Sequence, residues 1–167
     1  MTTQTLRSLL LVLLASGCGA ANPGWSDEVR RQSALELECS DHQIAIQRYQ
    51  GHNYEALGCD HAVRYVCRDR VCTTASEPVA STHDGFRPFV ERVEAVRARL
   101  RELGPRITAA CSEGQPFSAK LVLRPQGAVS DLETMTRREG CLMQELRAES
   151  FASGTGVLQL THVFRAD

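Results

Sequence analysis

The chain has 167 residues, of which 43% are hydrophobic and 23% are charged, and its formal net charge is −1 at pH 7. The hydrophobic share excludes a wholly disordered chain, and the near balance of charges excludes the strongly basic surface of a nucleic-acid-binding protein. The length suffices for one medium domain or two small ones.

The first segment has the features of an export signal. Arg7 and the free amine give a weakly positive start, and an apolar stretch follows at residues 8–16. This stretch is too short to span a bilayer, which takes about 20 residues, but it has the length of a signal-peptide core. Residues 1–17 are therefore predicted to form a signal peptide.

Residues 14–18, Leu-Ala-Ser-Gly-Cys, end the apolar stretch and resemble a bacterial lipobox. In that motif small residues precede a cysteine that is acylated and becomes the new N-terminus. The resemblance implies that Cys18 carries a lipid anchor and that the protein faces the periplasm, with residues 18–26 as a linker at the membrane. Ala15 stands where leucine is commoner in the motif. A secreted protein without an anchor, cleaved near Ala20, is the alternative.

The residue after the anchor bears on the choice of membrane. In well-studied bacteria an aspartate at this position retains lipoproteins in the inner membrane, whereas this chain has Gly19. The resemblance therefore favours the outer membrane.

Six further cysteines follow Cys18, and exported cysteines usually pair with one another. They are Cys39, Cys59, Cys67, Cys72, Cys111 and Cys141. Small polar residues and Pro78 between residues 73 and 84 predict an interdomain linker, which we place at residues 75–84. It separates a small Cys-rich domain, residues 27–74, from a second domain, residues 85–167.

The Cys-rich domain is predicted to be a short helix followed by an antiparallel β-meander. Residues 27–37 carry capping residues and an imperfect apolar face, and short β-prone runs follow at 43–49, 54–59, 62–67 and 71–72. Neighbouring strand ends in a meander favour the pairs Cys39–Cys59 and Cys67–Cys72. Such crosslinks are what a domain of about 50 residues needs, because it buries little apolar surface.

The second domain is predicted to have the order α-β-β-α-β. Apolar residues recur at spacings of three and four over residues 86–103, which predicts a helix that ends at Gly104-Pro105. A short helical piece at 106–111, a hairpin at 117–133, a helix at 137–149 and a last strand at 157–165 follow. With both helices on one face of the sheet, Cys111 and Cys141 can pair. The chain as a whole is therefore predicted to be α+β.

About the last 80 residues resemble the TonB/TolA C-terminal-like domain, in the two-cysteine form of myxobacterial envelope and gliding-motility proteins of the AgmX type. The resemblance is carried by Ile107-x-x-x-Cys111, Gly127-x-Val129, Cys141-x-x-x-x-Leu146, Phe151 and the closing strand. It implies a docking module that pairs with partner strands or surfaces in the periplasm and catalyses nothing. The family's aromatic-x-Pro segment is reduced here to Phe151. We expect the strand Val157–Phe164 to offer an open edge to a partner.

A metal or small-ligand site in the first domain is the alternative function. Cys39-x-x-His42 and Cys59-x-His61 supply ligand types for zinc, but their spacings match no zinc ribbon or finger. A site around His42, His52 and His61 would serve a metal or another small ligand. No cofactor is predicted.

The sequence does not favour an enzyme. It contains no Gly-x-Ser-x-Gly elbow, no His-Glu-x-x-His and no Gly-rich phosphate loop. Four arginines of the long predicted helix, Arg92, Arg97, Arg99 and Arg101, form a possible face for an anionic partner. Interspersed glutamates favour a solvated helix face instead. The sequence thus predicts a non-catalytic binding or scaffolding lipoprotein, with the membrane and an envelope protein as partners.

Overall fold

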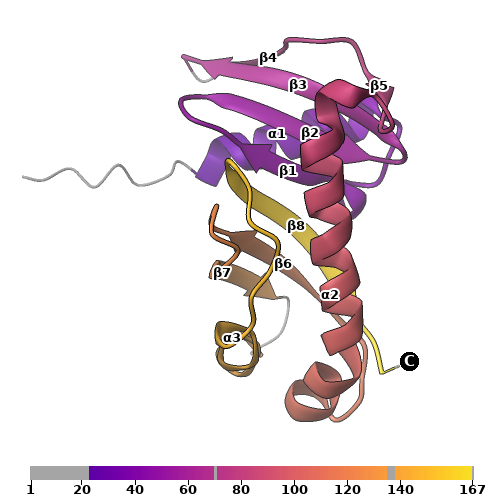
Figure 1. The fold of residues 1–167 in the computed structure, drawn as a ribbon, viewed down its shortest axis with the longest axis vertical. Coiled ribbons are helices and arrows are strands. Elements are labelled where there is room, and N and C mark those ends of the chain that lie inside the picture. Colours follow the sequence, from indigo (N-terminus) through magenta and orange to yellow (C-terminus); the bar gives the residue numbers. More distant parts are fainter. Residues whose placement is uncertain (1–22, 70, 135–137, 167) are drawn as a thin grey trace, which may run out of the picture.

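The structure, a computed structural model, describes residues 23–69, 71–134 and 138–166. It confirms the α+β class: helices pack on an antiparallel sheet of eight strands, in the order β4-β3-β2-β1-β8-β6-β7, with β5 also paired to β3 (Figure 1). No helix in these ranges is long and apolar enough to cross a bilayer.

The first half supplies one helix and a meander. Its elements are α1 (Pro23–Glu36), the 3-10 turn η1 (Asp41–Gln43), β1 (Ala45–Arg48), β2 (Asn53–Gly58), β3 (His61–Arg68), β4 (Val71–Thr74) and β5 (Val79–Ala80). The described part of α1 starts at Pro23, so residues 23–26 of the predicted linker are helical. Trp25 packs against the hydrophobic cluster between α1 and the sheet. β5 lies within the predicted interdomain linker and pairs with β3.

The second half has the predicted order of helices and strands. Its elements are η2 (Asp84–Phe86), α2 (Arg87–Ser112), β6 (Phe117–Leu123), β7 (Val129–Thr134), α3 (Glu139–Arg147) and β8 (Val157–Phe164). The predicted stop at Gly104-Pro105 is wrong, because α2 continues through both residues. Leu103 and Ile107 are buried on either side of the proline. Their packing outweighs the hydrogen bond that proline removes.

One sheet runs through both halves of the chain. β8 lies between β1 and β6, with Ile46 opposite Gln159 and Arg48 opposite Val157. The expectation that β8 is an open edge is therefore wrong, and the sheet ends at β7 on one side and at β4 and β5 on the other. The meander and the later hairpin do not form separate sheets.

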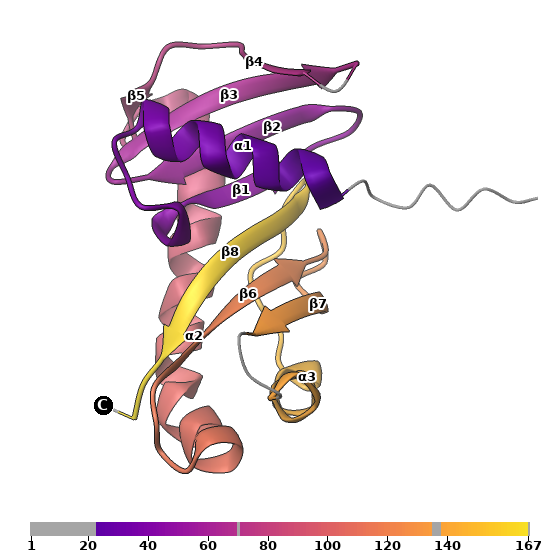
Figure 2. The ribbon, with the colours of Figure 1, turned by 180° about the vertical axis from the view of Figure 1, so that it is seen from behind.

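The helices cover the sheet unequally. α2 and α3 pack on one face, where Phe89, Val93 and Leu100 join Leu158 and Leu160 in a buried cluster. α1 packs on the opposite face over β1, β2 and β3 (Figure 2). On that face no helix of the described chain covers β8, β6 and β7, which lie open beside α1.

The six cysteines form the three predicted disulfides. Cys39 pairs with Cys59, Cys67 with Cys72 and Cys111 with Cys141, with Cα–Cα separations of 5.8, 3.9 and 5.7 Å. The third bond joins α2 to α3 on the face they share. Cys18 and the predicted signal peptide lie outside the described residues.

Candidate functional site

The uncovered sheet face and the flank of α1 enclose a groove of about 890 Å³, which we call the α1 groove. Figure 2 shows its two sides, α1 above and the bare strands β8, β6 and β7 below. Residues from α1, η1 and the strands line it, among them Arg30, Leu35, Asp41, Lys120, Glu133 and Thr161. The groove thus brings together residues from both halves of the chain.

An ion pair crosses the α1 groove. The Lys120 Nζ on β6 lies 2.6 Å from the Asp27 carboxylate on α1 and 3.8 Å from the Glu133 carboxylate on β7. Arg31 instead turns to Glu28 along the exposed side of α1, at 2.6 Å. The positive charges of Lys120 and Arg31 are therefore each paired with a carboxylate of the protein itself.

Arg30 differs from its neighbours because it is buried, with only 8% of its surface exposed. Its Nη1 donates to the Ile44 carbonyl at 2.5 Å and to the Asp41 carbonyl at 3.3 Å. Its Nε and Nη2 are also buried, and no partner for them exists among the described residues. Burial lowers the pKa of Arg30, while the charges of Asp27 and Asp41 oppose that shift.

A second groove, of about 800 Å³, lies between α2 and β8 and is lined in part by Arg97 and His162. The Arg97 Nη2 donates to the Gln43 carbonyl at 2.9 Å. Burial, followed by the charges of Arg101, Arg97 and Arg165, lowers the pKa of His162 to about 4. His162 is therefore neutral near pH 7 and offers no positive charge to a ligand.

The three histidines of the alternative metal site lie exposed on separate elements. His42 is in η1, and His61 opens β3. His52 follows β1 and packs against Trp25 in a tilted arrangement, with ring centroids 4.4 Å apart. Across residues 23–69, 71–134 and 138–166, no three His, Cys, Asp or Glu side chains are grouped to hold a metal. The cysteines proposed as their co-ligands are in disulfides.

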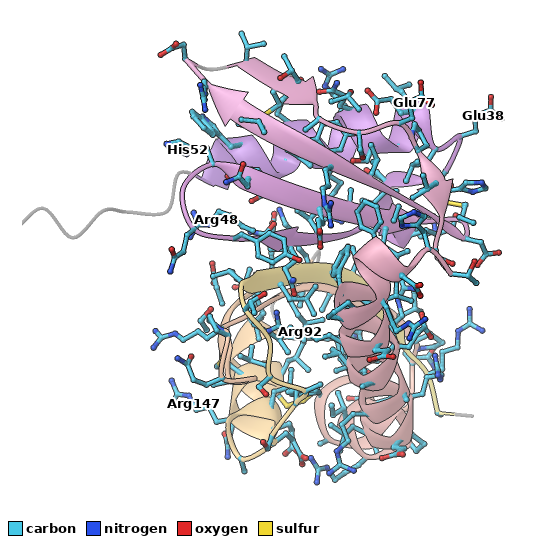
Figure 3. The ribbon with its side chains drawn as sticks, turned by 45° about the horizontal axis from the view of Figure 1, so that its top comes forward. Glu38, Arg48, His52, Glu77, Arg92 and Arg147 are labelled. Atoms are coloured by element: carbon cyan, nitrogen blue, oxygen red, sulfur yellow. A yellow bond between two sulfur atoms is a disulfide. The ribbon has the colours of Figure 1, made fainter. Side chains whose placement is uncertain are left out.

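The four arginines of α2 do not form one surface. Arg92 is 4% exposed and points into the protein between α2 and the segment before β8 (Figure 3). Arg99 pairs with Glu102 and Glu149, whereas Arg101 is exposed. The buried position of Arg92 has a sequence signal, because it lies three residues after Phe89 and four before Val96, on the apolar stripe.

Arg92 donates four hydrogen bonds within the protein. Its guanidinium donates to the Gln47 side chain and the Gly156 carbonyl, both at 2.7 Å, and to two further carbonyls. These are the Arg124 carbonyl, at 3.0 Å, and the Ala152 carbonyl, at 3.2 Å. Arg92 therefore fastens α2 to β1 and to two loops, and four of its five N–H donors are used within the protein.

A polar chain continues from Gln47 across the α2 side of the sheet. The Gln47 Nε2 donates to the Tyr49 hydroxyl at 2.8 Å, and that hydroxyl donates to Glu55. Arg64 binds the other Glu55 oxygen at 2.9 Å and the Gly85 carbonyl at 2.7 Å. Burial and the Glu55 carboxylate raise the pKa of Tyr49. This series of hydrogen bonds connects the sheet to the start of α2. It is therefore a structural network.

Comparison of the chain with family models, with curated proteins and with solved structures gives no match.

Proposed function

We propose that the protein is a lipid-anchored module of the cell envelope that binds a partner through the α1 groove and performs no chemistry. The main support for this proposal is the sheet face beside α1. No helix of the described chain covers it, and together with α1 it forms the α1 groove. Groove surfaces of this kind commonly receive ligands or peptides. The partner in this proposal is an envelope protein.

Export is supported by the cysteines. The six that follow Cys18 pair completely within the fold, and disulfides persist in oxidising compartments. Cys18 is thereby left without a partner in the described chain and ends an apolar run that resembles a lipobox. The same resemblance, with Gly19 after the anchor, supports the outer membrane facing the periplasm.

The absence of chemistry is proposed because the two tyrosines whose pKa is raised most, Tyr49 and Tyr65, have structural partners. Tyr49 is tied to Glu55, and Tyr65 donates to Glu36 at 2.7 Å. The ionic side chains that cross the groove are paired with each other. Together they form internal braces. The histidine–carboxylate pair that lines the groove, His42 and Asp41, is exposed, and its Nδ1 and Oδ1 atoms lie 3.8 Å apart, beyond hydrogen-bond distance.

The resemblance to the TonB/TolA C-terminal-like domain remains part of the proposal. The order α2-β6-β7-α3-β8 is the order it implies. Gly127 and Phe151, both in the resembling pattern, are in contact: the Phe151 N–H donates to the Gly127 carbonyl at 3.3 Å. If this half docks by strand pairing, β7 and not β8 presents the edge.

The anchor is tested by replacing Cys18 with serine in the native cell. The variant should move from the membrane pellet to the soluble periplasmic fraction, and the wild-type protein should carry an acylated cysteine as its first residue by mass spectrometry. The double variant Cys111→Ala/Cys141→Ala is the control, since it alters cysteines but not the lipobox. Membrane retention of the Cys18→Ser protein would contradict the anchor.

Binding through the groove is tested by photo-crosslinking in cells. A photoreactive amino acid at Leu35, on the rim of the groove, should give a discrete crosslinked envelope protein. The same amino acid at Glu91, exposed on α2 at the other face, is the matched control. Equal crosslinking from both positions would argue against the groove as the binding surface.

A further inference from the structure

We propose that one end of the sheet rests on the anionic lipid surface to which the protein is anchored. We call it the arginine end, because it carries Arg48, Arg68, Arg124 and Arg147. This inference rests on the proposed anchor at Cys18, and it names the lipid chemistry that the protein contacts and the orientation of the protein on the membrane.

Three of these arginines stand at the ends of strands that run in the same direction. β1 and β3 both pair antiparallel with β2, and β1 and β6 both pair antiparallel with β8. The ends of β1, β3 and β6 therefore lie on the same side of the sheet. Arg48 is the last residue of β1, Arg68 is the last residue of β3, and Arg124 follows β6 directly.

The arginine end has an excess of positive charge. Arg68, Arg124 and Arg147 are exposed, and none of the four arginines forms an ion pair with a carboxylate of the described residues. Asp69 is exposed after Arg68, but arginines stand on both sides of it in the sequence. Residues 49–53, 125–128 and 153–156, which connect the strands here, contain no Asp, Glu, Lys or Arg. An anionic lipid surface attracts such an end.

The opposite end of the meander carries negative charge. The β2–β3 turn contains Asp60, and Glu38 follows the C-terminal end of α1. Figure 3 shows the separation, with Arg48 and Arg147 on the left side of the molecule and Glu38 and Glu77 on the right. An anionic surface therefore attracts one end of the meander and repels the other, which favours one orientation of the protein.

α1 begins at the arginine end. Trp25, in its first turn, packs against His52 in the β1–β2 turn, with ring centroids 4.4 Å apart. Pro23, the first described residue of α1, is five residues after Cys18 (23 − 18). A chain of that length spans at most about 18 Å. An anchor at Cys18 therefore keeps the arginine end close to the bilayer.

Two apolar side chains at this end suit the membrane interface. Val71 lies opposite Arg68 in the β3–β4 pair, and 60% of its surface is exposed. Trp25 is half-buried, and tryptophan is enriched at the level of the lipid head groups. Arginines together with apolar side chains are typical of protein surfaces that lie on anionic membranes.

The test uses the protein purified from native membranes and reconstituted into vesicles of phosphatidylglycerol or of phosphatidylcholine. A photoreactive amino acid replaces Val71, and mass spectrometry measures the lipid that it captures. The yield should be at least about fivefold higher with phosphatidylglycerol, since one arginine near an anionic surface favours contact by roughly that factor. High salt concentration should lower the yield. Val163, 40% exposed near the last residue of β8, is the matched control position and should capture little lipid.

Two double variants separate the position of the charges from their number. Arg68→Gln/Arg124→Gln should lower the lipid capture at Val71 by at least about fivefold. Arg101→Gln/Arg165→Gln removes two charges from exposed positions outside the arginine end, and it should change the capture less than about twofold. The melting temperature of each variant shows whether it is folded.

Three results would overturn the inference: equal capture with both lipids, equal capture at Val71 and Val163, or equal losses in the two double variants. Flotation with the vesicles reports the anchor separately, because an acylated protein floats with either lipid. A protein that floats but captures no lipid at Val71 contradicts the orientation and leaves the anchor and the α1 groove in place. A protein that floats with neither lipid contradicts the anchor itself.

Discussion

Two buried arginines show how differently one side chain can serve this protein. Arg92 has four acceptors for its donors, so its burial stabilises the fold. Arg30 has acceptors among the described residues for Nη1 only. The first pattern is typical of a structural residue, whereas the second leaves Nε and Nη2 buried without a partner among the described residues, which is uncommon in folded proteins.

Replacing Arg92 with methionine should lower the free energy of unfolding by about 3–5 kcal/mol. Methionine fills a similar volume but leaves the Gly156, Arg124 and Ala152 carbonyls without their charged donor. Urea denaturation of the oxidised protein measures the change. Arg101→Met, on an exposed position of the same helix, should stay within about 0.5 kcal/mol of the wild type. A loss as small in Arg92→Met would show that these bonds do not stabilise the fold.

His162 should make the protein less stable as the pH falls. Its pKa is about 4 in the folded protein, against 6.5 for an unperturbed histidine, because burial and three arginines disfavour its charged form. Between these values the unfolded chain binds a proton that the folded chain does not, so stability is full above pH 6.5 and decreases down to about pH 4. Allowing for solvent screening, the loss is roughly 1–2 kcal/mol.

The measurement is urea denaturation across this pH range for the wild type and His162→Gln. Glutamine cannot take up the proton, so the variant should lose this part of the pH dependence. NMR titration of the His162 ring should place its midpoint near 4. A midpoint close to 6.5 would contradict the burial of this ring.

At the scale of helices and strands, sequence patterns predict most elements and the three cysteine pairs between them, but not the pairing of β1 with β8. The apolar spacing over residues 86–103 identifies the buried face of α2, and turn residues between the strand runs identify the β1–β2 and β6–β7 hairpins. Gly127 has a positive φ of 86°, and a Cβ there would lie 2.1 Å from the Phe151 carbonyl. The predicted helix end at Gly104-Pro105 is wrong because the helix-breaking tendency of proline is outweighed by the burial of Leu103 and Ile107 on either side of it.

The Cys111–Cys141 disulfide joins α2 to α3, and its removal should lower the stability of the protein. It closes a loop of about 31 residues, so on the chain-entropy model its removal lowers the free energy of unfolding by about 3–4 kcal/mol. Cys111→Ala/Cys141→Ala should show this in urea denaturation. Cys67→Ala/Cys72→Ala is the comparison, and its short loop contributes about 2 kcal/mol on the same model. The reverse order of the two losses would contradict loop length as the dominant factor.

At the scale of the whole molecule, the β1–β8 pairing is what the sequence could not reveal. Alternation along residues 157–164 shows which side chains are buried, but it does not show which strands lie on the two edges. The α1 groove follows from this pairing, because it places α1 of the first half beside the bare strands of the second. Individual groove residues such as Arg30 and Lys120 therefore carry no sequence signal that would bring them together.

Because one sheet spans both halves, we expect the protein to unfold in a single cooperative transition. Trp25 is the sole tryptophan and lies in α1, so its fluorescence reports the first half. Far-UV circular dichroism is dominated by α2, of 26 residues, in the second half. With β8 held between β1 and β6, neither half can unfold without exposing the edge and buried side chains of the other. The two signals should therefore give the same urea midpoint.

A proline at Leu158 tests the cause of this coupling. Leu158 lies opposite Gln47 on β1 and opposite Leu123 on β6, so proline there removes a ladder donor inside the sheet. Proline at Thr73, on the edge strand β4, is the control and should lower stability much less. If fluorescence and circular dichroism of the wild type give two different midpoints, the two halves unfold independently despite the β1–β8 pairing. Coincident midpoints, together with a larger loss for Leu158→Pro than for Thr73→Pro, would identify β8 as the strand that makes the two halves one folding unit.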